Sequence, residues 1–470
     1  MQPQGSRSAF TEVRWDRFSG WTLTIFLCLI PIILWFTVRP PSQFFSGGFY
    51  GTMSNLGRVT GLVGMVMYSL NLIYSTRMKF LEKLFGGLNR VYIAHHVLGG
   101  LALVMLCFHP FFLAVRYLTS SVRQAALLLL PHDLAPVSAL FDSKNQLHLD
   151  VLQQWAVFFG IVAFWGMVVL LIFTFFIKLP YHVWLFTHKF LGFAFFLAGL
   201  HVLFIASDTS RNGLLKYYIL LIAFLGLVAF VYRTIMPKIF IKRYKYYVDN
   251  VSTVGGNVTK LDLRPVDTKM LFTPGQFVFI RFMYSGKKVV TSEWHPFSIS
   301  SGEKDDLLEI SVKSLGDYTS QLAKLQHGVV AEIEGAYGRF SYTNFKNKNQ
   351  IWVAGGIGIT PFLSMAKSLP DDGYKIDLYY SVKAQSELIQ WEKLVEIARV
   401  KKGKFRLIPF VADDKKEFLT TDFIVKYSKN LQGKEIFICG PPPMMQSLRK
   451  QFRMGGVPNS KIHSEEFAMS

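Results

Sequence analysis

The sequence has few charged residues and few cysteines. Charged residues make up 17% of its 470 residues, against about 25% in an average soluble domain. Apolar residues make up 51% and the mean hydropathy is +0.29, so a wholly soluble protein and a disordered one are both excluded. The cysteines Cys28, Cys107 and Cys439 lie far apart with no C-x-x-C motif. They therefore encode neither a disulfide scaffold nor a zinc finger.

Negative charge is also scarce. The sequence has 51 Lys and Arg against 31 Asp and Glu, a net charge of +20. A chain this basic can bind nucleic acid, anionic lipid or anionic cofactors. The apolar composition favours the lipid bilayer, and we expect no nucleic-acid partner.

Six long apolar runs dominate the first half of the chain. Each approaches the roughly 20 residues that a helix needs to cross about 30 Å of hydrocarbon. The first run follows a polar lead, residues 1–19, and no small-residue cleavage site comes after it, so we interpret it as a membrane span and not a signal peptide. Residues 20–238 are predicted to form a six-span α-helical membrane bundle. The expected spans lie near residues 20–38, 55–76, 92–118, 152–177, 184–205 and 214–236.

Basic residues in the short connections predict the orientation in the membrane. The lead contains three arginines, whereas the first connection contains only Arg39. Because Lys and Arg collect on the cytoplasmic side, we expect the lead and the chain after the sixth span to be cytoplasmic and residues 119–150 to face outside. The expected location is the plasma membrane or inner cell membrane. The basic residues of the lead and of the second connection are Arg7, Arg14, Arg17, Arg77, Lys79, Lys83 and Arg90.

The second half changes character twice. Residues 239–346 contain short alternating segments such as QFVFIRFMY and DLLEISVKS, which are typical of an antiparallel sheet or β-barrel. Residues 347–470 repeat the order strand, Gly-rich turn, helix. This order predicts an α/β domain whose parallel sheet binds a nucleotide at its carboxyl edge.

Four histidines in the membrane half form two matched pairs. The third span begins His95-His96-Val-Leu-Gly and the fifth begins His188-Lys-Phe-Leu-Gly. His109 and His201 follow the first His of each span by 14 and 13 residues, which places two levels roughly 20 Å apart along parallel helices. We therefore predict two stacked bis-histidine haem sites, with His95 facing His188 at the inner level and His109 facing His201 at the outer level.

Two details accompany this repeat. A glycine follows each first His by four residues, at Gly99 and Gly192, and is expected to leave one helix face bare where a flat macrocycle needs room. His96 is the spare ligand, because the repeat aligns His95 with His188. The alternative is that the histidines are buried polar residues bonded to neighbouring helices.

On these pairs, the sequence resembles the ferric reductase and NADPH oxidase transmembrane family over nearly its whole length. The resemblance implies two b-type haems held by the third and fifth spans. It also implies a ferredoxin-reductase-like dehydrogenase half that binds FAD and NAD(P)H.

Two segments of the barrel region resemble FAD-binding motifs of that superfamily. Residues 295–298 resemble the strand along the flavin ring, with a Ser hydroxyl near the reactive edge, although read alone they are an extended segment before a turn. Residues 313–319 resemble the pyrophosphate site, where Thr319 or Asp317 is expected to cap an anion-attracting helix. The candidate FAD residues are His295, Pro296, Phe297, Ser298, Lys313, Gly316 and Thr319.

Three segments of the last domain resemble nicotinamide-binding motifs. The turn Gly-Gly-Ile-Gly-Ile-Thr-Pro lets the backbone approach a phosphate, with the Thr expected to cap the next helix and the Pro to begin it. The resemblance implies that Cys439 lies beside the nicotinamide, although an inert thiol is the alternative, and that Phe467 covers the flavin ahead of a three-residue tail. Basic or hydroxyl groups after the strand KIDLYY are expected to bind the 2′-phosphate of NADPH, with NADH as the other possible donor. The cofactor-binding candidates are Gly356, Gly358, Thr360, Pro361, Ser381, Lys383, Gly440 and Pro441.

The cofactor set predicts an order of electron transfer. A nicotinamide delivers two electrons as a hydride, FAD can release them one at a time, and a haem accepts one. The expected path is NADPH, FAD, inner haem, outer haem, then an acceptor reduced at the haem edge, because four His ligands leave the irons no open position. Arg58, near the outer end of the second span, is expected to neutralise a haem propionate or attract superoxide, or else to be an interfacial arginine.

The expected acceptor is oxygen, giving superoxide. Some superoxide-forming relatives carry a further His one turn after the outer ligand, where this chain has Leu113, which weakens the assignment to oxygen without removing it. Reduction of ferric chelates by the same mechanism is the rival. Two other classes are possible alternatives. A membrane adaptor or channel that retains the fold without catalysis predicts broken motifs, and none is missing here. A haem-only quinol-linked cytochrome is disfavoured by the dehydrogenase half.

Overall fold

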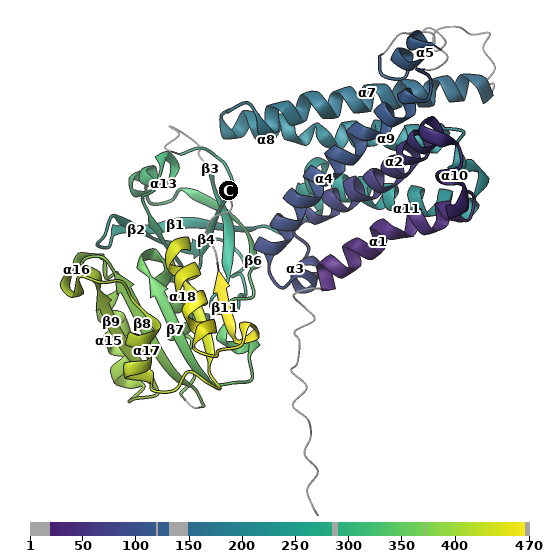
Figure 1. Cartoon of the computed structure of the whole chain (residues 1–470). Coiled ribbons are helices and arrows are strands. Elements are labelled where there is room, and N and C mark those ends of the chain that lie inside the picture. The colour runs from purple at the N-terminus through teal and green to yellow at the C-terminus, as the bar shows by residue number, and fades with distance from the viewer. Residues whose placement is uncertain (1–18, 119–120, 131–148, 284–289, 372, 466–470) are drawn as a thin grey trace, which may run out of the picture. The chain divides into compact units, whose positions relative to one another are not determined.

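The computed structural model describes residues 19–118, 121–130, 149–283, 290–371 and 373–465. These residues fall into two compact units, one ending at Ile241 and the other beginning at Lys242. Figure 1 shows helices throughout the first unit and two sheets with their helices in the second. The predicted boundary at residue 238 falls inside the short helix α12 (Pro237–Phe240), three residues before the division between the units.

The helical unit contains six helical segments that are long and apolar enough to cross a membrane, as the sequence predicted. The second span begins at Gly48, earlier than expected, and the fifth consists of two helices that meet at Phe190. The spans are Ser19–Phe36, Gly48–Tyr74, Leu88–Val115, Leu152–Phe175, His182–Phe204 and Gly213–Ile235. The helices are α1 (Ser19–Phe36), α2 (Gly48–Tyr74), α3 (Lys79–Phe85), α4 (Leu88–Val115), α5 (Val122–Leu127), α7 (Leu149–Phe175), α8 (Tyr181–Lys189), α9 (Leu191–Phe204), α10 (Asp208–Arg211) and α11 (Gly213–Phe230), with a 3₁₀ turn at Pro41–Gln43 and a π turn at Val231–Ile235.

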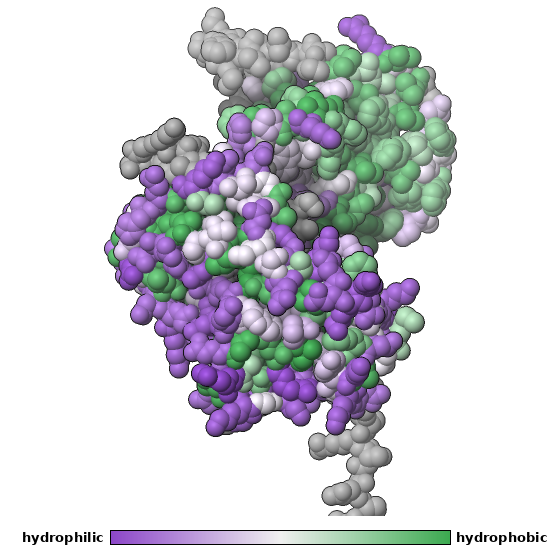
Figure 2. Space-filling model, turned by 90° about the vertical axis from the view of Figure 1, so that its left-hand side faces the viewer, coloured by the Kyte–Doolittle hydropathy of each residue, from purple (hydrophilic) through white to green (hydrophobic). Residues whose placement is uncertain are grey.

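Large apolar side chains point outward from these spans. Ile25 and Phe26 on α1 are each 58% exposed and Phe224 on α11 is 61% exposed. On the face turned to the viewer in Figure 2, green hydrophobic residues cover much of the helical unit, whereas the second unit is mainly purple. Such an apolar surface is stable in contact with lipid and costly in water. The chain is therefore an integral membrane protein.

The first part of the second unit is an antiparallel barrel. Its six strands follow the order β4-β3-β6-β1-β2-β5, and an additional bridge between Ile299 and Ile310 joins the two ends of that order. Alternate residues such as Leu261, Val278 and Ile310 are fully buried inside it. The strands are β1 (Tyr244–Thr253), β2 (Val258–Pro265), β3 (Phe277–Met283), β4 (His295–Ser298), β5 (Leu308–Lys313) and β6 (Val330–Tyr337), followed after β5 by α13 (Asp317–Gln321) and a 3₁₀ turn at Leu322–Lys324.

The last part is an α/β layer structure with a parallel sheet. Its strands lie in the order β11-β10-β7-β8-β9. The chain runs from β7 to β8 and β9 on one side and then returns to β10 on the other side of β7. Doubly wound sheets bind nucleotides at such a switch point. The strands are β7 (Asn349–Gly355), β8 (Lys375–Val382), β9 (Phe405–Val411), β10 (Glu435–Cys439) and β11 (Ile462–Glu465). The helices are α14 (Thr360–Lys367), α15 (Trp391–Val400), α16 (Ala412–Lys415), α17 (Thr421–Ser428) and α18 (Pro442–Met454), with 3₁₀ turns at Tyr342–Asn344, Gly356–Ile359, Gln385–Glu387 and Asn459–Lys461.

Candidate functional site

The four histidines lie in the two predicted pairs. The ring centroids of His95 on α4 and His188 on α8 are 6.3 Å apart, and those of His109 on α4 and His201 on α9 are 6.4 Å apart. A metal ion about 2.0 Å from one nitrogen of each ring would separate such centroids by about 6.2 Å, because each centroid lies about 1.1 Å behind its nitrogen. The spacing in both pairs therefore fits a shared metal centre between the rings.

Hydrogen bonds at Nδ1 orient the rings of three of these histidines and leave Nε2 for a ligand. The Nδ1 atoms of His95, His109 and His201 lie 3.0, 2.6 and 2.8 Å from the carbonyl oxygens of Asn71, Gly57 and Ala156. When Nδ1–H donates to a carbonyl, Nε2 keeps its lone pair for a metal. His188 Nδ1 lies 3.5 Å from Thr174 Oγ1. In the described part of the chain, no group of three or more His, Cys, Asp and Glu could hold a metal ion.

Glycines that sequence reasoning missed make room for the outer pair. A Cβ atom on Gly61 of α2 would lie 2.4 Å from His109 Nδ1, and one on Gly160 of α7 would lie 2.6 Å from His201 Nδ1. Both distances are well below van der Waals contact. The signal was available as glycines inside apolar spans, but only the packed helices show which histidine each one faces.

The expected role of the glycines within the repeat is wrong. A Cβ on Gly99 would meet Asn71 Nδ2 at 3.0 Å, and one on Gly192 would meet the Phe230 ring at 2.0 Å. Neither glycine leaves a bare face, because a neighbouring helix fills the space beside it. Their small size serves close helix packing instead.

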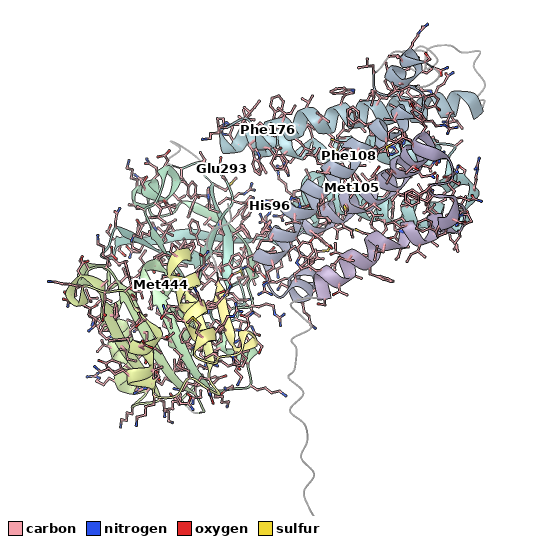
Figure 3. The ribbon with its side chains drawn as sticks, in the orientation of Figure 1. His96, Met105, Phe108, Phe176, Glu293 and Met444 are labelled. Carbon is pink, nitrogen blue, oxygen red and sulfur yellow. The ribbon has the colours of Figure 1, made fainter. Side chains whose placement is uncertain are left out.

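His95 and its neighbour His96 differ in environment. His96, labelled on α4 in Figure 3, is exposed, whereas His95 is half-buried and faces His188. The ring of His95, the histidine that the sequence repeat aligned with His188, is therefore the one in contact with the His188 ring.

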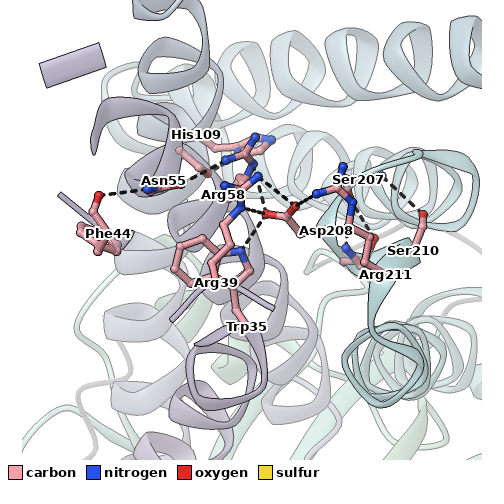
Figure 4. A network of polar contacts seen from close by, with 12 residues as sticks. Trp35, Arg39, Phe44, Asn55, Arg58, His109, Ser207, Asp208, Ser210 and Arg211 are labelled. Atoms are coloured by element: carbon pink, nitrogen blue, oxygen red, sulfur yellow. Dashed lines mark hydrogen bonds and ion pairs between the residues drawn. The ribbon is translucent and has the colours of Figure 1, made fainter. Parts of the chain in front are cut away.

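The outer pair lines a cavity of about 620 Å³ that also reaches Arg58. Arg58 Nε lies 3.3 Å from Asp208 Oδ2, and its Nη1 donates to Asn55 Oδ1 at 3.1 Å. Figure 4 shows the network in which Arg39 and Trp35 also donate to the Asp208 carboxylate, at 2.8 and 3.1 Å. Sequence reasoning missed Asp208. Among the described residues, the arginines that line this cavity are Arg39, Arg58, Arg116 and Arg211.

Asp208 stays ionised despite its burial. Burial raises the pKa of its carboxyl, but the hydrogen bonds from Arg39 and Trp35 and the charge of Arg58 outweigh that effect and hold the pKa below its usual range. Leu113 also lines the cavity. Its side chain packs so closely on Gly57 that a Cβ atom added to Gly57 would lie 2.9 Å from it. The part of the cavity around Asp208 therefore carries an excess of positive charge among the described residues, and position 113 is a leucine.

The segment 295–298 forms β4, an end strand of the barrel's hydrogen-bonded order. Phe297 pairs with Val278 of β3 and Ser298 is buried. His295 stacks on Tyr318 with ring centroids 3.6 Å apart. Burial lowers the pKa of His295, although Glu293 at 3.6 Å opposes that shift, so the imidazole is neutral near pH 7.

The expected helix cap in the phosphate segment is wrong. Gly316 is the N-cap of α13, and neither Thr319 nor Asp317 occupies that position. The Thr319 hydroxyl instead accepts from the backbone N–H groups of Leu315 and Gly316 at 2.9 and 3.1 Å. A threonine three residues into the helix can reach back to the cap in this way, so it still orders the turn next to Lys313.

The Gly-rich turn and the Cys-Gly-Pro turn pack against each other at the end of β7 and β10. A Cβ on Gly358 would lie 2.3 Å from the Cys439 carbonyl oxygen, and one on Gly440 would lie 3.0 Å from the Gly355 Cα. Gly356 has φ +53° with open space beside it, a conformation that favours glycine. The carboxyl edge of the sheet is thus lined by backbone that a ligand can approach closely.

The first residue of α14 also differs from expectation. Thr360 is not a cap, because Ile359 occupies the N-cap position and the Thr360 hydroxyl donates to the Ile357 carbonyl at 3.1 Å. Pro361 lies in the first turn as predicted. The four-residue 3₁₀ turn Gly356–Ile359 runs directly into the helix, which shifts the cap back by one residue.

Cys439 ends β10 in a fully buried position, and Pro441 after it is exposed. Burial, with a smaller contribution from Glu465, raises the pKa of the Cys439 thiol well above its usual range. Glu465 pairs with Cys439 in register on β11. Phe467 lies outside the described residues.

Glu387 lies between two lysines that the sequence assigned to different cofactors. Its Oε1 is 3.8 Å from Lys313 Nζ, and its Oε2 accepts from the Lys383 backbone N–H at 3.3 Å. Ser381 lies in β8, in register with Gly355 of β7. Sequence reasoning missed Glu387. Its position shortly after β8 was an available signal, because sheets of this kind often place a carboxylate after a strand, near the nucleotide.

The fold and these segments define an integral membrane oxidoreductase with a dehydrogenase that binds FAD and NAD(P)H. Three family models match the chain in order: ferric reductase like transmembrane component over residues 60–199, FAD-binding domain over 243–355, and oxidoreductase NAD-binding domain over 352–450. This order matches the ferric reductase and NADPH oxidase type of fusion, as the sequence predicted.

The curated relatives include an electron transfer component, a flavohemoprotein and a reductase. The chain is 26% identical over 239 residues to the toluate 1,2-dioxygenase electron transfer component of Pseudomonas putida, covering 48% of this chain and 68% of that protein. It is 27% identical to a flavohemoprotein of Candida norvegensis, covering 44% of this chain and 53% of the relative. It is 28% identical to NADH-cytochrome b5 reductase 1 of Lodderomyces elongisporus, covering 40% and 65%. The match spans less than two thirds of the last two proteins.

Solved structures give weaker likenesses. The cytochrome P450 reductase GcoB of Amycolatopsis matches with a TM-score of 0.41 and 21% identity over 48% of this chain and 70% of that one. A flavohemoglobin of Malassezia yamatoensis matches with a TM-score of 0.45 and 18% identity over 71% of this chain and 91% of that one. Neither likeness assigns a ligand or an activity to this chain.

Proposed function

We propose that this protein carries electrons across a membrane, from cytoplasmic NADPH through FAD and two b-type haems to oxygen on the outer face, forming superoxide. The observation that carries the proposal is the spacing of the histidine rings in two pairs. His95 and His188, and His109 and His201, face one another at the spacing of two axial ligands, with Nδ1 atoms held by groups of other helices. A pair of imidazoles at each of two levels of a helix bundle is suited to hold one haem per level.

FAD takes two electrons as a hydride and passes them on singly, and each haem carries one. The residues supply position and electrostatics. Gly356, Gly358 and the turn at Gly440 let the nucleotide approach the sheet edge, where Cys439 lies at the strand end. FAD is proposed to be held by Pro296, Phe297 and Ser298 on β4 and by Lys313, Gly316 and Thr319 at the end of β5 and just after it. The 2′-phosphate of NADPH is proposed to be held by Ser381 and Lys383.

The acceptor side rests on Arg58 and the cavity that it lines. A guanidinium held by Asp208 at 3.3 Å offers a fixed positive charge to a haem propionate or to superoxide as it forms. The direction of transfer follows from the predicted orientation, with the lead and the dehydrogenase in the cytoplasm of a plasma or inner cell membrane. Moving an electron outward is favoured by an inside-negative potential, at about 2.3 kcal/mol per 100 mV.

Ferric chelates are the second candidate acceptor. Four arginines line the outer cavity with Asp208 between them, and an anionic chelate is attracted by such an excess of positive charge. Leu113 stands where a further His would favour oxygen. The two acceptors share the electron path and differ only in what meets the outer face.

The test is oxidation of NADPH by the purified full-length protein in detergent, reconstituted with FAD and haem. Superoxide formation predicts that cytochrome c reduction under air is abolished by superoxide dismutase. Reduction of a ferric chelate that persists without oxygen and is unaffected by the dismutase favours the second acceptor. A protein that binds neither FAD nor haem and oxidises no NADPH would be a membrane adaptor, and the proposal would be wrong.

A further inference from the structure

One carboxylate oxygen joins three segments of the dehydrogenase unit. Glu309 on β5 accepts through Oε1 from Gln390 Nε2 at 2.8 Å, from Lys367 Nζ at 2.9 Å and from Ser300 Oγ at 3.1 Å. Its Oε2 lies 3.4 Å from Lys260 Nζ on β2. Two partners come from the barrel and two from the nucleotide-binding layer, so Glu309 links the two parts of this unit.

Each of the three donors to Oε1 follows a proposed cofactor segment. Ser300 comes two residues after the flavin segment 295–298. Lys367 is the last residue of α14, which begins where the Gly-rich turn ends. Gln390 ends the segment 383–390, which begins at the proposed 2′-phosphate residue Lys383. A single oxygen thus connects the flavin strand, the helix behind the nucleotide turn and the segment after β8.

The contacts are mostly shielded from water. The side chains of Glu309 and Lys367 are only 13% and 8% exposed. Burial raises the pKa of Glu309, but Lys367, Gln390 and Lys260 outweigh it, so the pKa is lowered and the carboxylate is ionised at neutral pH. Removing one member of a buried, hydrogen-bonded charge pair leaves the other uncompensated. The arrangement is therefore rigid while intact and sensitive to loss of Glu309.

The backbone around Gln390 is shaped for this contact. Gln390 has φ +51°, a left-handed conformation that few non-glycine residues adopt without compensating contacts. On the barrel side, a Cβ on Gly255 would lie 2.8 Å from the Ser386 carbonyl oxygen and one on Gly256 3.2 Å from the Glu387 Cα. Both glycines have positive φ, +56° and +52°. The segment 383–390 is therefore packed directly on the barrel next to the Glu309 contact.

We propose that Glu309 is a positioning residue for hydride transfer, which holds the nicotinamide-binding segments at a fixed place relative to the flavin strand. The inference rests on the proposed transfer from NADPH to FAD. Hydride transfer is steeply sensitive to the distance and angle between donor and acceptor, and a displacement of about 1 Å can cost on the order of a hundredfold in rate. A carboxylate that ties both sides together sets that geometry without touching either cofactor.

The test compares Glu309→Gln with a matched control in the full-length protein. Glu332→Gln is the control. Glu332 also forms an ion pair, to Arg281 at 2.6 Å, and has a similar exposed fraction of 18%, but this pair joins two strands of the barrel, β3 and β6. The rate of flavin reduction by NADPH is measured by anaerobic stopped flow, together with its primary deuterium isotope effect. Amide hydrogen exchange of residues 383–390 is measured on the same proteins without nucleotide.

Glu309→Gln is expected to slow flavin reduction by about tenfold or more with a larger isotope effect, while the KM for NADPH changes little. Exchange in residues 383–390 should rise above that of Glu332→Gln. Equal rates and equal exchange in the two variants would overturn the proposal. A wild-type protein whose flavin NADPH does not reduce would instead overturn the proposed function, and the exchange comparison would still test the Glu309 contact.

A milder variant keeps the test decisive if Glu309→Gln does not fold. Gln390→Gly removes one donor to Glu309 and keeps the left-handed backbone, which glycine adopts freely. Lys402→Gly is its control, at another position of positive φ, +39°, outside the Glu309 contacts. Slower flavin reduction in Gln390→Gly alone supports the positioning role, and no difference between the two contradicts it.

Discussion

Several residues that are proposed to meet a ligand are held in place by other residues. His109 and His201 are fixed by carbonyl oxygens of α2 and α7, and Arg58 is fixed by Asp208 and Asn55. Such partners decide ring orientation, tautomer and the direction of a charge. Single residues therefore give sharp tests only when the partner is known as well.

Cys439 is predicted to be unreactive in the native protein. Its thiol is fully buried and its pKa is raised well above the usual value of about 8.5, and a raised pKa means that the reactive thiolate is absent until the pH exceeds the raised value. Treatment with N-ethylmaleimide near pH 8 should leave the Cys439 peptide unlabelled in mass spectrometry, and labelling should appear after denaturation. Rapid labelling of the native protein would contradict this burial.

Lys383→Ala is predicted to raise the KM for NADPH by about tenfold and leave that for NADH nearly unchanged, because only a charge-assisted phosphate contact is removed. Glu387, whose carboxylate accepts from the Lys383 N–H, opposes a 2′-phosphate, so Glu387→Gln should shift the preference the other way. Steady-state kinetics with both nucleotides measure this. Equal use of NADH and NADPH by the wild type, or an unchanged ratio in Lys383→Ala, would reject the assignment.

Phe467 is predicted to stack on the flavin until nicotinamide displaces it. Deletion of residues 467–470 should therefore alter the affinity or preference for nicotinamide nucleotides, because the deletion removes a competitor for the flavin face. The measurement is kcat and KM for NADH and NADPH. If all four values stay the same, Phe467 has no such role.

At the scale of helices, glycine sets how closely the spans approach the histidines. α2 packs against α4, and α7 against α9, and in both contacts a glycine lies opposite a histidine ring. Lipid gives little hydrophobic drive for helix association, so such close approach depends on small residues and van der Waals packing. The rings of His109 and His201 have room beside them because α2 has Gly61 and α7 has Gly160 at the points of contact.

Gly160→Ala is predicted to disrupt the outer haem site while sparing the inner one. The added methyl would lie 2.6 Å from His201 Nδ1, so the ring must leave the Ala156 carbonyl and turn away from His109. Haem content should fall from about two to about one per chain, measured as pyridine haemochrome. Gly199→Ala on α9 is the control, because nothing lies within 4 Å of its added Cβ, and equal haem content in the two variants would contradict the prediction.

At the scale of the whole molecule, two units of different solvent preference are joined in one chain. The helical unit exposes apolar side chains, and the face of the dehydrogenase unit shown in Figure 2 is mainly hydrophilic. Each unit has its own kind of site: half-buried imidazole pairs in the first, and a barrel followed by a parallel nucleotide-binding sheet in the second. The proposed reaction needs both, since a hydride donor and a one-electron carrier cannot exchange directly without a flavin between them.

The full-length protein is predicted to bind two low-spin b-type haems. The ring spacing in each histidine pair fits two imidazole ligands, and a haem held by both would be low-spin because the protein would fill both remaining positions on its iron. Pyridine haemochrome titration of fully loaded protein should give about two haems per chain, and His109→Ala should lose one of them. A value near zero or one in the wild type would rule out the two-haem arrangement.

Much of this molecule follows from local sequence patterns. The six spans depend on the length of apolar runs, the pairing of His95 with His188 on a matched repeat, and the order of barrel and nucleotide-binding layer on hydrophobic periodicity and Gly-rich turns. Such features need only near neighbours along the chain. Span ends and helix caps were less certain, as Gly48, Gly316 and Ile359 show, because a shift of one residue changes little in the local pattern.

Contacts between distant segments were decided only by the tertiary structure. The bond between His109 and the Gly57 carbonyl joins residues 52 apart, and the bonds of Glu309 reach residues 58 and 81 positions away. No periodicity or motif marks such partners, because an apolar span with a glycine, or a strand with one glutamate, fits many packings equally well. The sequence thus determines which elements form and which residues can do chemistry, whereas packing between helices and across the dehydrogenase determines what orients them.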